Sequence, residues 1–408
     1  MYTKEAYNSL LKSTAQNIDI SDEMFEAAEK TYKDLGKWID QETPDYEISI
    51  YPQGSFALGT VVRPITNADD YDLDIVCQFK SQYGLTAKEL KVDVVKPLLV
   101  RYKKTSREIE EKKRCWHVEY DDVPNFHMDV IPAHTYGSVI RITDHNEDYD
   151  TYDYLGSNPA GYVKWFFDAC AKQRNRLYEQ YIKDHRTVVA QAEVEDVKRR
   201  KVKTPLQRVV QILKRHRDIK FADDNSGNKP ISIIITTIAG RLYEEEDNIY
   251  DALFNILSKA PSWIMDNRKG QQFYIENPSY KGENFADKWN THPERATAFF
   301  KWLDTARKDL VDGRLLQYNK IEMGNHLKEC FGSETGKAVF NSEAETVRSA
   351  IAAGTLKVDT STGNISKELA AFVNASSTVF AVNSCHSDII NLISAHSFTY
   401  LLLHAKCT

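Results

Sequence analysis

Several features that would assign the chain to a structural class are missing from its 408 residues. No apolar stretch reaches the roughly 20 residues that a membrane-spanning helix needs, and the N-terminal residues lack the apolar core of a secretory signal peptide. The six cysteines, at positions 77, 115, 170, 330, 385 and 407, have no paired spacing. Scattered thiols of this kind are typical of a reducing compartment. The sequence therefore predicts a cytoplasmic protein with no membrane association.

The chain also lacks the excess of basic residues that a general nucleic-acid-binding protein carries. Its formal net charge is −6 at pH 7. One segment, residues 198–220, departs from this balance with ten Lys and Arg residues against one acid, Asp218. Two interpretations of this segment carry equal weight: a solvated helix face, or a positive wall that faces a polyanionic ligand.

The spacing of apolar residues predicts a mixed sheet followed by helices. Ser21 can cap a helix over 22–41, whose apolar residues recur at helical spacing. Strands are expected at 46–50, 69–79, 115–121, 126–132 and 137–142, and helices at 53–60 and 87–105. After Pro159 the expected helices cover 160–190, 205–219, 232–245, 248–258 and 296–311, and residues 353–366 are expected to form a loop.

This order of elements is typical of an α+β fold with a cleft between its two parts. We expect a sheet lobe with N-terminal helices over 1–158 and a helical lobe over 159–352 that completes the cleft. The role of the remaining segment, 353–408, is not indicated by its sequence.

Acidic side chains gather on one face of the strand expected at 69–79. The two-residue period places Asp70, Asp72 and Asp74 on that face and apolar residues on the other. Three carboxylates on one face repel one another, so the arrangement is costly unless cations lie between them. Mg²⁺ is the hard cation that binds carboxylate and phosphate oxygens together. The segment therefore predicts a Mg²⁺ site.

A Gly-Ser turn lies 17 residues ahead of the Asp-x-Asp pair. Gly54 allows the backbone to approach a phosphate closely, and Ser55 adds a hydroxyl donor at the start of a helix. Gly59 and Thr60 close the turn. A Gly-Ser turn alone would be a capped surface turn, but its position before the acidic strand favours a phosphate site.

A third carboxylate is needed to complete a two-metal site, and it should come from a neighbouring strand. Asp129 is the one acid on the otherwise core-like strand at 126–132, and we interpret it as that ligand. Cys115, Trp116 and His117 lie on another expected strand, and we interpret them as packing residues.

These residues carry a resemblance to a known family. GSFALGT, DYDLD and MDVIPA resemble the motifs of the DNA polymerase β-type nucleotidyltransferase superfamily, and within it the cGAS/DncV-like nucleotidyltransferases of bacterial CBASS anti-phage systems. YLGSNPAGYVKWF, LQRVVQILKRHRD and KPISIIITTIAGRLY extend the resemblance across residues 45–245.

The resemblance implies roles for the site residues. Asp72 and Asp74 would bind both of two Mg²⁺ ions, for which Mn²⁺ can substitute, and Asp129 would hold the second ion and help to activate the attacking hydroxyl. The residues expected at the nucleotide are Gln53, Gly54, Ser55, Thr60, Lys214 and Ser232.

Lys214 and Ser232 belong to the expected helical lobe. Thr204 can cap a helix with Pro205 at its first position, and the buried stripe of that helix leaves Lys214 at its margin, within reach of the cleft. In the family, the residues that match Lys214 and Ser232 contact phosphate. The alternatives are a solvated lysine and a serine that caps its helix.

The implied reaction is attack of a ribose hydroxyl on the α-phosphate of an NTP, with release of pyrophosphate. The product would be a cyclic di- or trinucleotide that signals to a downstream effector, with ATP among the substrates and room for a regulatory protein partner. No nucleic-acid template or activator is expected, because the chain is acidic and lacks the Cys/His cluster of DNA-sensing relatives. The alternatives are linear oligonucleotide synthesis, nucleotidyl transfer to another acceptor, or a binding scaffold with a decayed site. The intact Asp72, Asp74 and Asp129 argue against the scaffold.

Overall fold

The computed structural model describes residues 2–66, 71–80, 84–102, 109–120, 126–184, 202–352, 357–359, 365–366 and 379–381. The chain divides into two compact units, Met1–Lys337 and Ala338–Thr408. Parts of the sequence that carried predictions lie outside the described residues, among them Asp70, residues 185–190 of the helix expected at 160–190, and residues 198–201 of the basic segment.

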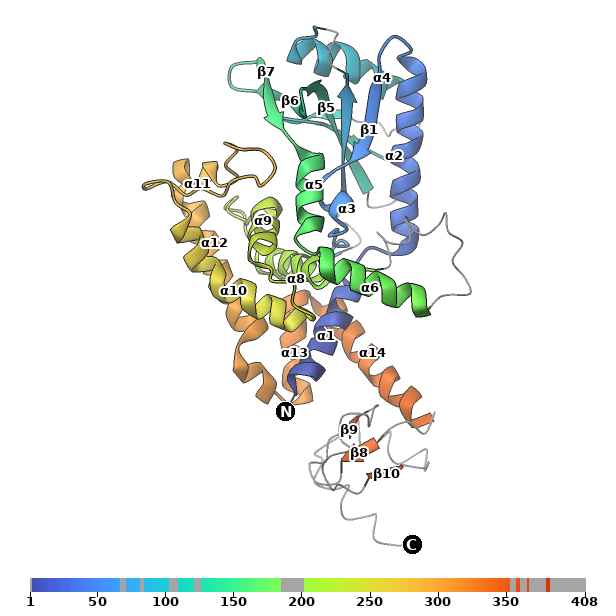
Figure 1. The fold of residues 1–408 in the computed structure, drawn as a ribbon, viewed down its shortest axis with the longest axis vertical. Helices are drawn as coiled ribbons and strands as arrows, with labels where there is room; N and C mark the ends of the chain where they lie inside the picture. The colour runs from blue at the N-terminus through green and yellow to red at the C-terminus, as the bar shows by residue number, and fades with distance from the viewer. Residues whose placement is uncertain are drawn as a thin grey trace. The chain divides into compact units, whose positions relative to one another are not determined.

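A mixed seven-stranded sheet forms one part of the first unit (Figure 1). Its strands are β1 (Ile48–Pro52), β2 (Tyr71–Phe79), β3 (Ile109–Glu111), β4 (Trp116–Glu119), β5 (Phe126–Tyr136), β6 (Val139–Asn146) and β7 (Thr151–Ser157). The strand order is β1-β2-β5-β4-β3, with β6 pairing with the far end of β5 and β7 pairing with β6. Only β2 and β5 run parallel; the other pairs are antiparallel.

Helices make up most of the rest of this unit. Those before or within the sheet are α1 (Lys4–Asn17), α2 (Asp22–Glu42), α3 (Gly54–Leu58), the π-helical segment η1 (Glu89–Val95) and α4 (Lys96–Arg101). Those after the sheet are α5 (Pro159–Asp168), α6 (Ala171–Asp184), α8 (Pro205–Lys220), α9 (Ser232–Leu242), α10 (Ile249–Asp266), α11 (Asp287–Thr291), α12 (Pro293–Val311), η2 (Gly313–Gln317), α13 (Lys320–Phe331) and α14 (Ser333–Ala352), the last of which continues into the second unit.

The sheet has one apolar face that the N-terminal helices cover. Leu73 and Ile75 on β2 and Met128 on β5 are fully buried there, in one cluster with the apolar residues of α2, η1 and α4. The two-residue period of the strands leaves the acidic residues on the opposite face. Packing on one face therefore fixes the face on which the carboxylates gather.

Helix α8 lies at the centre of the helical part, in contact with α1, α9, α10, α12 and α13. The predicted cap is confirmed: the Thr204 hydroxyl and the Gln207 side chain form a capping box. Lys214, Arg215 and Arg217 of α8 are nevertheless as buried as its apolar stripe, whereas Lys220 is exposed. The interpretation as a solvated face was therefore wrong for most of the described part of the basic segment, and the interpretation as a positive wall that faces a polyanionic ligand stays a prediction.

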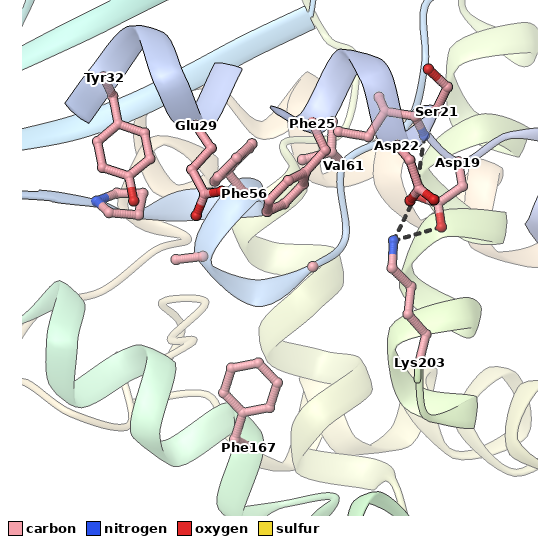
Figure 2. Close-up of a pocket in the computed structure, with 14 residues that line it drawn as sticks. Asp19, Ser21, Asp22, Phe25, Glu29, Tyr32, Phe56, Val61, Phe167 and Lys203 are labelled. Atoms are coloured by element: carbon pink, nitrogen blue, oxygen red, sulfur yellow. Dashed lines mark hydrogen bonds and ion pairs between the residues drawn. The ribbon is translucent and has the colours of Figure 1, made fainter. Parts of the chain in front are cut away.

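Polar side chains at the beginning of α8 take part in a buried cluster of ion pairs and hydrogen bonds. Asp19, in the turn between α1 and α2, accepts hydrogen bonds from Lys203 at 2.6 Å, from Arg208 at 2.9 Å and from Gln211 at 3.0 Å. Figure 2 shows Lys203 directed at Asp19. These hydrogen bonds and ion pairs join the turn between α1 and α2 to the beginning of α8.

The predicted α+β class is confirmed, and several predicted elements need correction. The helix expected at 160–190 is two helices, α5 and α6, separated by a turn at 169–170. Strands β3 and β7 and helix α1 had no counterpart among the expected elements. The division into lobes at residues 158 and 352 stays a prediction.

The second unit contains a small antiparallel sheet in the order β10-β8-β9, made of Val379–Ala381, Lys357–Asp359 and Ile365–Ser366. Its strands β8 and β9 lie where a loop was expected over 353–366, so that prediction was wrong for these residues. Across the described parts of the chain, no helix has both the length and the apolar content needed to cross a membrane.

We predict that Asp19→Ala lowers the free energy of unfolding by about 2–4 kcal/mol, because it leaves two enclosed cations without their counter-charge. Urea denaturation measures the change. The control is Asp168→Ala, which removes a 61% exposed carboxylate paired with Lys164 and should cost less than about 0.5 kcal/mol. Equal losses in the two variants would contradict the structural role of the Asp19 cluster.

Candidate active site

The three carboxylates come together where β2 and β5 pair. Asp74 lies directly opposite Asp129 in the parallel register, and Asp72 lies opposite His127. Neighbouring strands are separated by about 4.8 Å, so side chains on one face of such a pair are close neighbours. The structure therefore places Asp72, Asp74 and Asp129 on one small patch of the sheet.

Among the three carboxylates, Asp74 is the one whose pKa is raised. Burial, followed by the charges of Asp129 and Asp72, raises the pKa of Asp74 to about 7. The positive charge of Lys214 opposes this shift without cancelling it. The predicted repulsion among the acids is thus concentrated on Asp74.

Asp72 behaves differently. Burial alone would raise the pKa of the Asp72 carboxyl, but the hydrogen bond and charge of His127, helped by Lys214, hold it below its usual value. The Nε2 atom of His127 lies 2.8 Å from Asp72 Oδ1. Asp72 is therefore already stabilised as an anion, which the prediction of uniform repulsion did not anticipate.

The Gly-Ser turn packs directly against Asp74. Gly54 has a φ of +58°, and a Cβ atom at this position would lie 2.3 Å from Asp74 Oδ2. The backbone N–H of Gln53 also donates to the Asp74 carbonyl over 2.8 Å. Only glycine fits here, both for its conformation and for the space beside the carboxylate.

Helix α8 holds the loop that follows this turn. Three of its side chains, Gln207, Gln211 and Lys214, donate hydrogen bonds to backbone carbonyls of residues 58–61 over 2.9, 2.7 and 3.1 Å. Burial, followed by the charge of Arg217, lowers the pKa of Lys214 to about 8, while Asp72 and Asp74 act in the opposite direction. Lys214 is thus a buried cation near the carboxylates, not a lysine at the margin of a stripe.

The other residues expected at the nucleotide fall into two groups. Ser55 and Thr60 belong to the turn beside Asp74, where Thr60 N–H donates to the Ser55 carbonyl over 2.8 Å. Ser232 is the first helical residue of α9 and not its cap, which is Ile231. Its hydroxyl accepts a hydrogen bond from Arg217 at 2.8 Å, and no described contact joins it to the three carboxylates. A nucleotide role for Ser232 stays a prediction.

Two histidines and a cysteine at this patch were missed or misassigned. His117, interpreted above as packing, lies with Nδ1 3.0 Å from Asp129 Oδ1. The Cys115 thiol is hydrogen-bonded to Asp129, and burial, followed by the Asp129 charge, raises its pKa well above the usual range. His127 precedes Asp129 by two residues, so the strand period alone could have placed it on the same face.

These residues fit a pair of divalent cations. Three carboxylates converge on one patch, and burial together with the charges of Asp129 and Asp72 raises the pKa of Asp74. Carboxylate oxygens together with phosphate oxygens are the ligands that Mg²⁺ prefers. The Gly54 backbone leaves room beside Asp74 that any side chain would fill.

A separate cavity lies between α2, α3 and α5 (Figure 2). Phe25, Phe56 and Phe167 line it, and Asp22 and Glu29 contribute acidic groups. None of the three carboxylates is among its lining residues. The carboxylate patch and this cavity are therefore different features of the molecule.

Comparison with known proteins agrees with the site. The family model described as cyclic GMP-AMP synthase DncV-like, nucleotidyltransferase domain, matches residues 48–132, which contain the Gly-Ser turn and all three carboxylates. A c-di-GMP synthase of Roseivirga ehrenbergii is 31% identical over 357 residues, covering 84% of this chain and 89% of that protein. The cyclic dinucleotide synthase CdnG of Bradyrhizobium diazoefficiens is 24% identical over 347 residues, covering 80% of each chain.

Solved structures show the same fold. CdnG of Bradyrhizobium diazoefficiens, in complex with GTP, has a TM-score of 0.65 at 21% identity, covering 83% of this chain and 99% of that one. CdnC of E. coli MS115-1, in a complex with HORMA-deltaN, has a TM-score of 0.53 at 14% identity, covering 80% and 97%.

The fold is that of a DNA polymerase β-like nucleotidyltransferase. Within that class, the chain belongs to the cGAS/DncV-like nucleotidyltransferases, and it is an enzyme of the cyclic oligonucleotide synthase type.

The Asp74 environment makes stability depend on pH in metal-free buffer. Because the folded-state pKa is raised above the unfolded one, stability should fall as pH rises from about 4 to about 7. We predict that Asp74→Asn removes this loss and makes the protein more stable than wild type by about 1–4 kcal/mol at pH 8, with little difference at pH 4.5.

Urea unfolding in EDTA at several pH values measures this effect. The matched control is Asp72→Asn, which loses an anion that His127 stabilises and should therefore give no gain at pH 8. A pH-independent difference between Asp74→Asn and wild type would contradict the electrostatic account of Asp74.

Proposed function

We propose that this enzyme synthesises a cyclic dinucleotide or trinucleotide from NTPs, with divalent metal ions bound by Asp72, Asp74 and Asp129. The observation that carries the proposal is the convergence of these carboxylates beside the Gly-Ser turn. GTP is the first substrate to test, because one relative is a c-di-GMP synthase, and ATP is the second.

The proposed chemistry is displacement at the α-phosphate. A ribose hydroxyl attacks the α-phosphorus, the bond to the bridging oxygen of pyrophosphate breaks, and the hydroxyl proton leaves toward Asp129 and then solvent. When bound, Mg²⁺ lowers the pKa of the attacking hydroxyl and neutralises charge on the leaving pyrophosphate. A second attack within the linear intermediate closes the ring of a dinucleotide, and a trinucleotide needs a third, each with release of one pyrophosphate.

The residues around the carboxylates have separate tasks in this scheme. Gly54 lets the backbone approach the triphosphate, and Ser55 donates its hydroxyl to a phosphate oxygen. Lys214, still mostly protonated at neutral pH with its pKa of about 8, supplies a positive charge next to Asp72 and Asp74. His117 and Cys115 orient Asp129 through their hydrogen bonds.

We place the reaction in the bacterial cytoplasm, where NTPs are available, and in anti-phage signalling through an effector that binds the product. The structural relative in complex with HORMA-deltaN supports a search for a regulatory protein partner. No nucleic-acid template is proposed, since each described cation of residues 202–220 has a partner within the chain.

The direct test uses nuclease-treated enzyme with each radiolabelled NTP and Mg²⁺ or Mn²⁺, followed by phosphatase. We expect a phosphatase-resistant cyclic product from NTPs alone or with a protein partner, and none from the folded Asp72→Asn/Asp74→Asn variant. Substantial product from that variant would show that the site is elsewhere. A phosphatase-sensitive product would favour linear synthesis, and strict dependence on added DNA or RNA would overturn the template-free proposal.

Lys214 offers a second test of the proposed site. Lys214→Ala should weaken binding of a nonhydrolysable NTP by about 1.5–3 kcal/mol, the range for a hydrogen bond to a charged group. Isothermal titration gives the dissociation constants. Arg215 is unsuitable as the neutral control, because it is buried and donates to the Arg63 carbonyl.

Lys220→Ala is the better control for Lys214. It removes the same charge from the same helix but at a side chain that pairs with Asp309. An unchanged dissociation constant for Lys214→Ala, with the fold intact, would limit Lys214 to holding the Thr60 carbonyl.

A further inference from the structure

Two histidines, His117 and His127, lie on the same patch of the sheet as the carboxylates. The strand registers set out two rows across β2, β5 and β4: Asp72, His127 and Glu119 in one, and Asp74, Asp129 and His117 in the other. All six side chains leave the same face of the sheet, since residues directly opposite in register share a face. His117 and His127 therefore lie beside the carboxylates rather than behind them.

The two imidazoles and Asp129 form a compact set of donors. One ligating atom from each of His117, His127 and Asp129 lies within 4.8 Å of the other two. The imidazole rings are 4.2 Å apart between centroids, and their side chains are 19% and 15% exposed. Both imidazoles are therefore partly exposed, and each has a ring nitrogen beside a carboxylate of the patch.

The donor set has a definite chemical preference. Mg²⁺ takes oxygen ligands almost without exception, whereas imidazole nitrogen suits borderline divalent metals. Two imidazoles and one carboxylate with open positions form a recurrent site for such metals. Each imidazole now contacts one carboxylate, and the two rings also contact each other, so both can reach one ion beside Asp129.

We propose that His117 and His127 are direct ligands of the metal ion held by Asp129, so that this position prefers a divalent transition metal, such as Mn²⁺, over Mg²⁺. The proposal rests on the proposed function in one respect, the assignment of Asp129 as a metal ligand. On binding, the ion replaces the hydrogen bonds that now join the imidazoles to Asp129 and Asp72.

The test is metal binding without nucleotide, so that it does not depend on turnover. Pulsed electron paramagnetic resonance of the enzyme with one equivalent of Mn²⁺ should detect ¹⁴N coupling from directly bound imidazole. The same wild-type protein grown with ¹⁵N-histidine should show the coupling of ¹⁵N instead. This arm requires no variant and therefore no assumption about folding.

Variants then assign the ligands. His117→Gln and His127→Gln should each weaken Mn²⁺ binding at least about tenfold and diminish the nitrogen coupling, while Mg²⁺ affinity, measured by competition, changes little. His134→Gln on the same strand β5 is the control and should leave both metals unaffected.

Absence of histidine nitrogen coupling, or of Mn²⁺ binding at one equivalent, would overturn the proposal and leave the imidazoles as orienting groups. Nitrogen coupling that stays undiminished in both variants, or equal loss of Mg²⁺ and Mn²⁺ affinity, would also overturn it. None of these results bears on whether the enzyme makes a cyclic product, which the radiolabel assay decides separately.

Discussion

Electrostatic repulsion at Asp74 is the constraint on which the rest of the site depends. The parallel pairing of β2 and β5 sets Asp74 opposite Asp129, with Asp72 two residues away on the same face. The apolar face of the same strands is buried under α2 and η1, so the acids cannot turn inward. A divalent cation relieves this repulsion, which makes the folded sheet a preorganised site for positive charge.

The Gly-Ser turn and the helical part belong to the same set of contacts as the carboxylates. Gly54 lies against Asp74, and the loop after it is held by donors on α8 that recur at one face, Gln207, Gln211 and Lys214. The Asp19 cluster secures the beginning of the same helix. Carboxylates, turn and cation are therefore positioned by one connected set of contacts, in which α8 is the common element.

Much of this site could be predicted from the sequence, because strand periodicity alone places Asp72 and Asp74 together and a Gly-Ser turn before them is rare. The residues that surround these carboxylates could not be predicted in the same way. Helical periodicity gave Lys214 a margin position, since it cannot show that the elements packed around α8 bury this side chain as well. His117 was interpreted as packing because its partner, Asp129, is on another strand, and the pairing of β4 with β5 is a tertiary fact. Strand β3 has only three residues, too few to show a period, whereas strand β7 has seven and was simply not expected.

The central claim is that Asp72, Asp74 and Asp129 hold metal ions against a triphosphate seated on the Gly-Ser turn. A crystal structure with Mn²⁺ and a nonhydrolysable GTP, with anomalous differences recorded for manganese, tests it most directly. The account predicts two manganese peaks at the three carboxylates and phosphate density beside Gly54 and Ser55. Manganese or triphosphate located elsewhere, for example in the cavity between α2, α3 and α5, would contradict it.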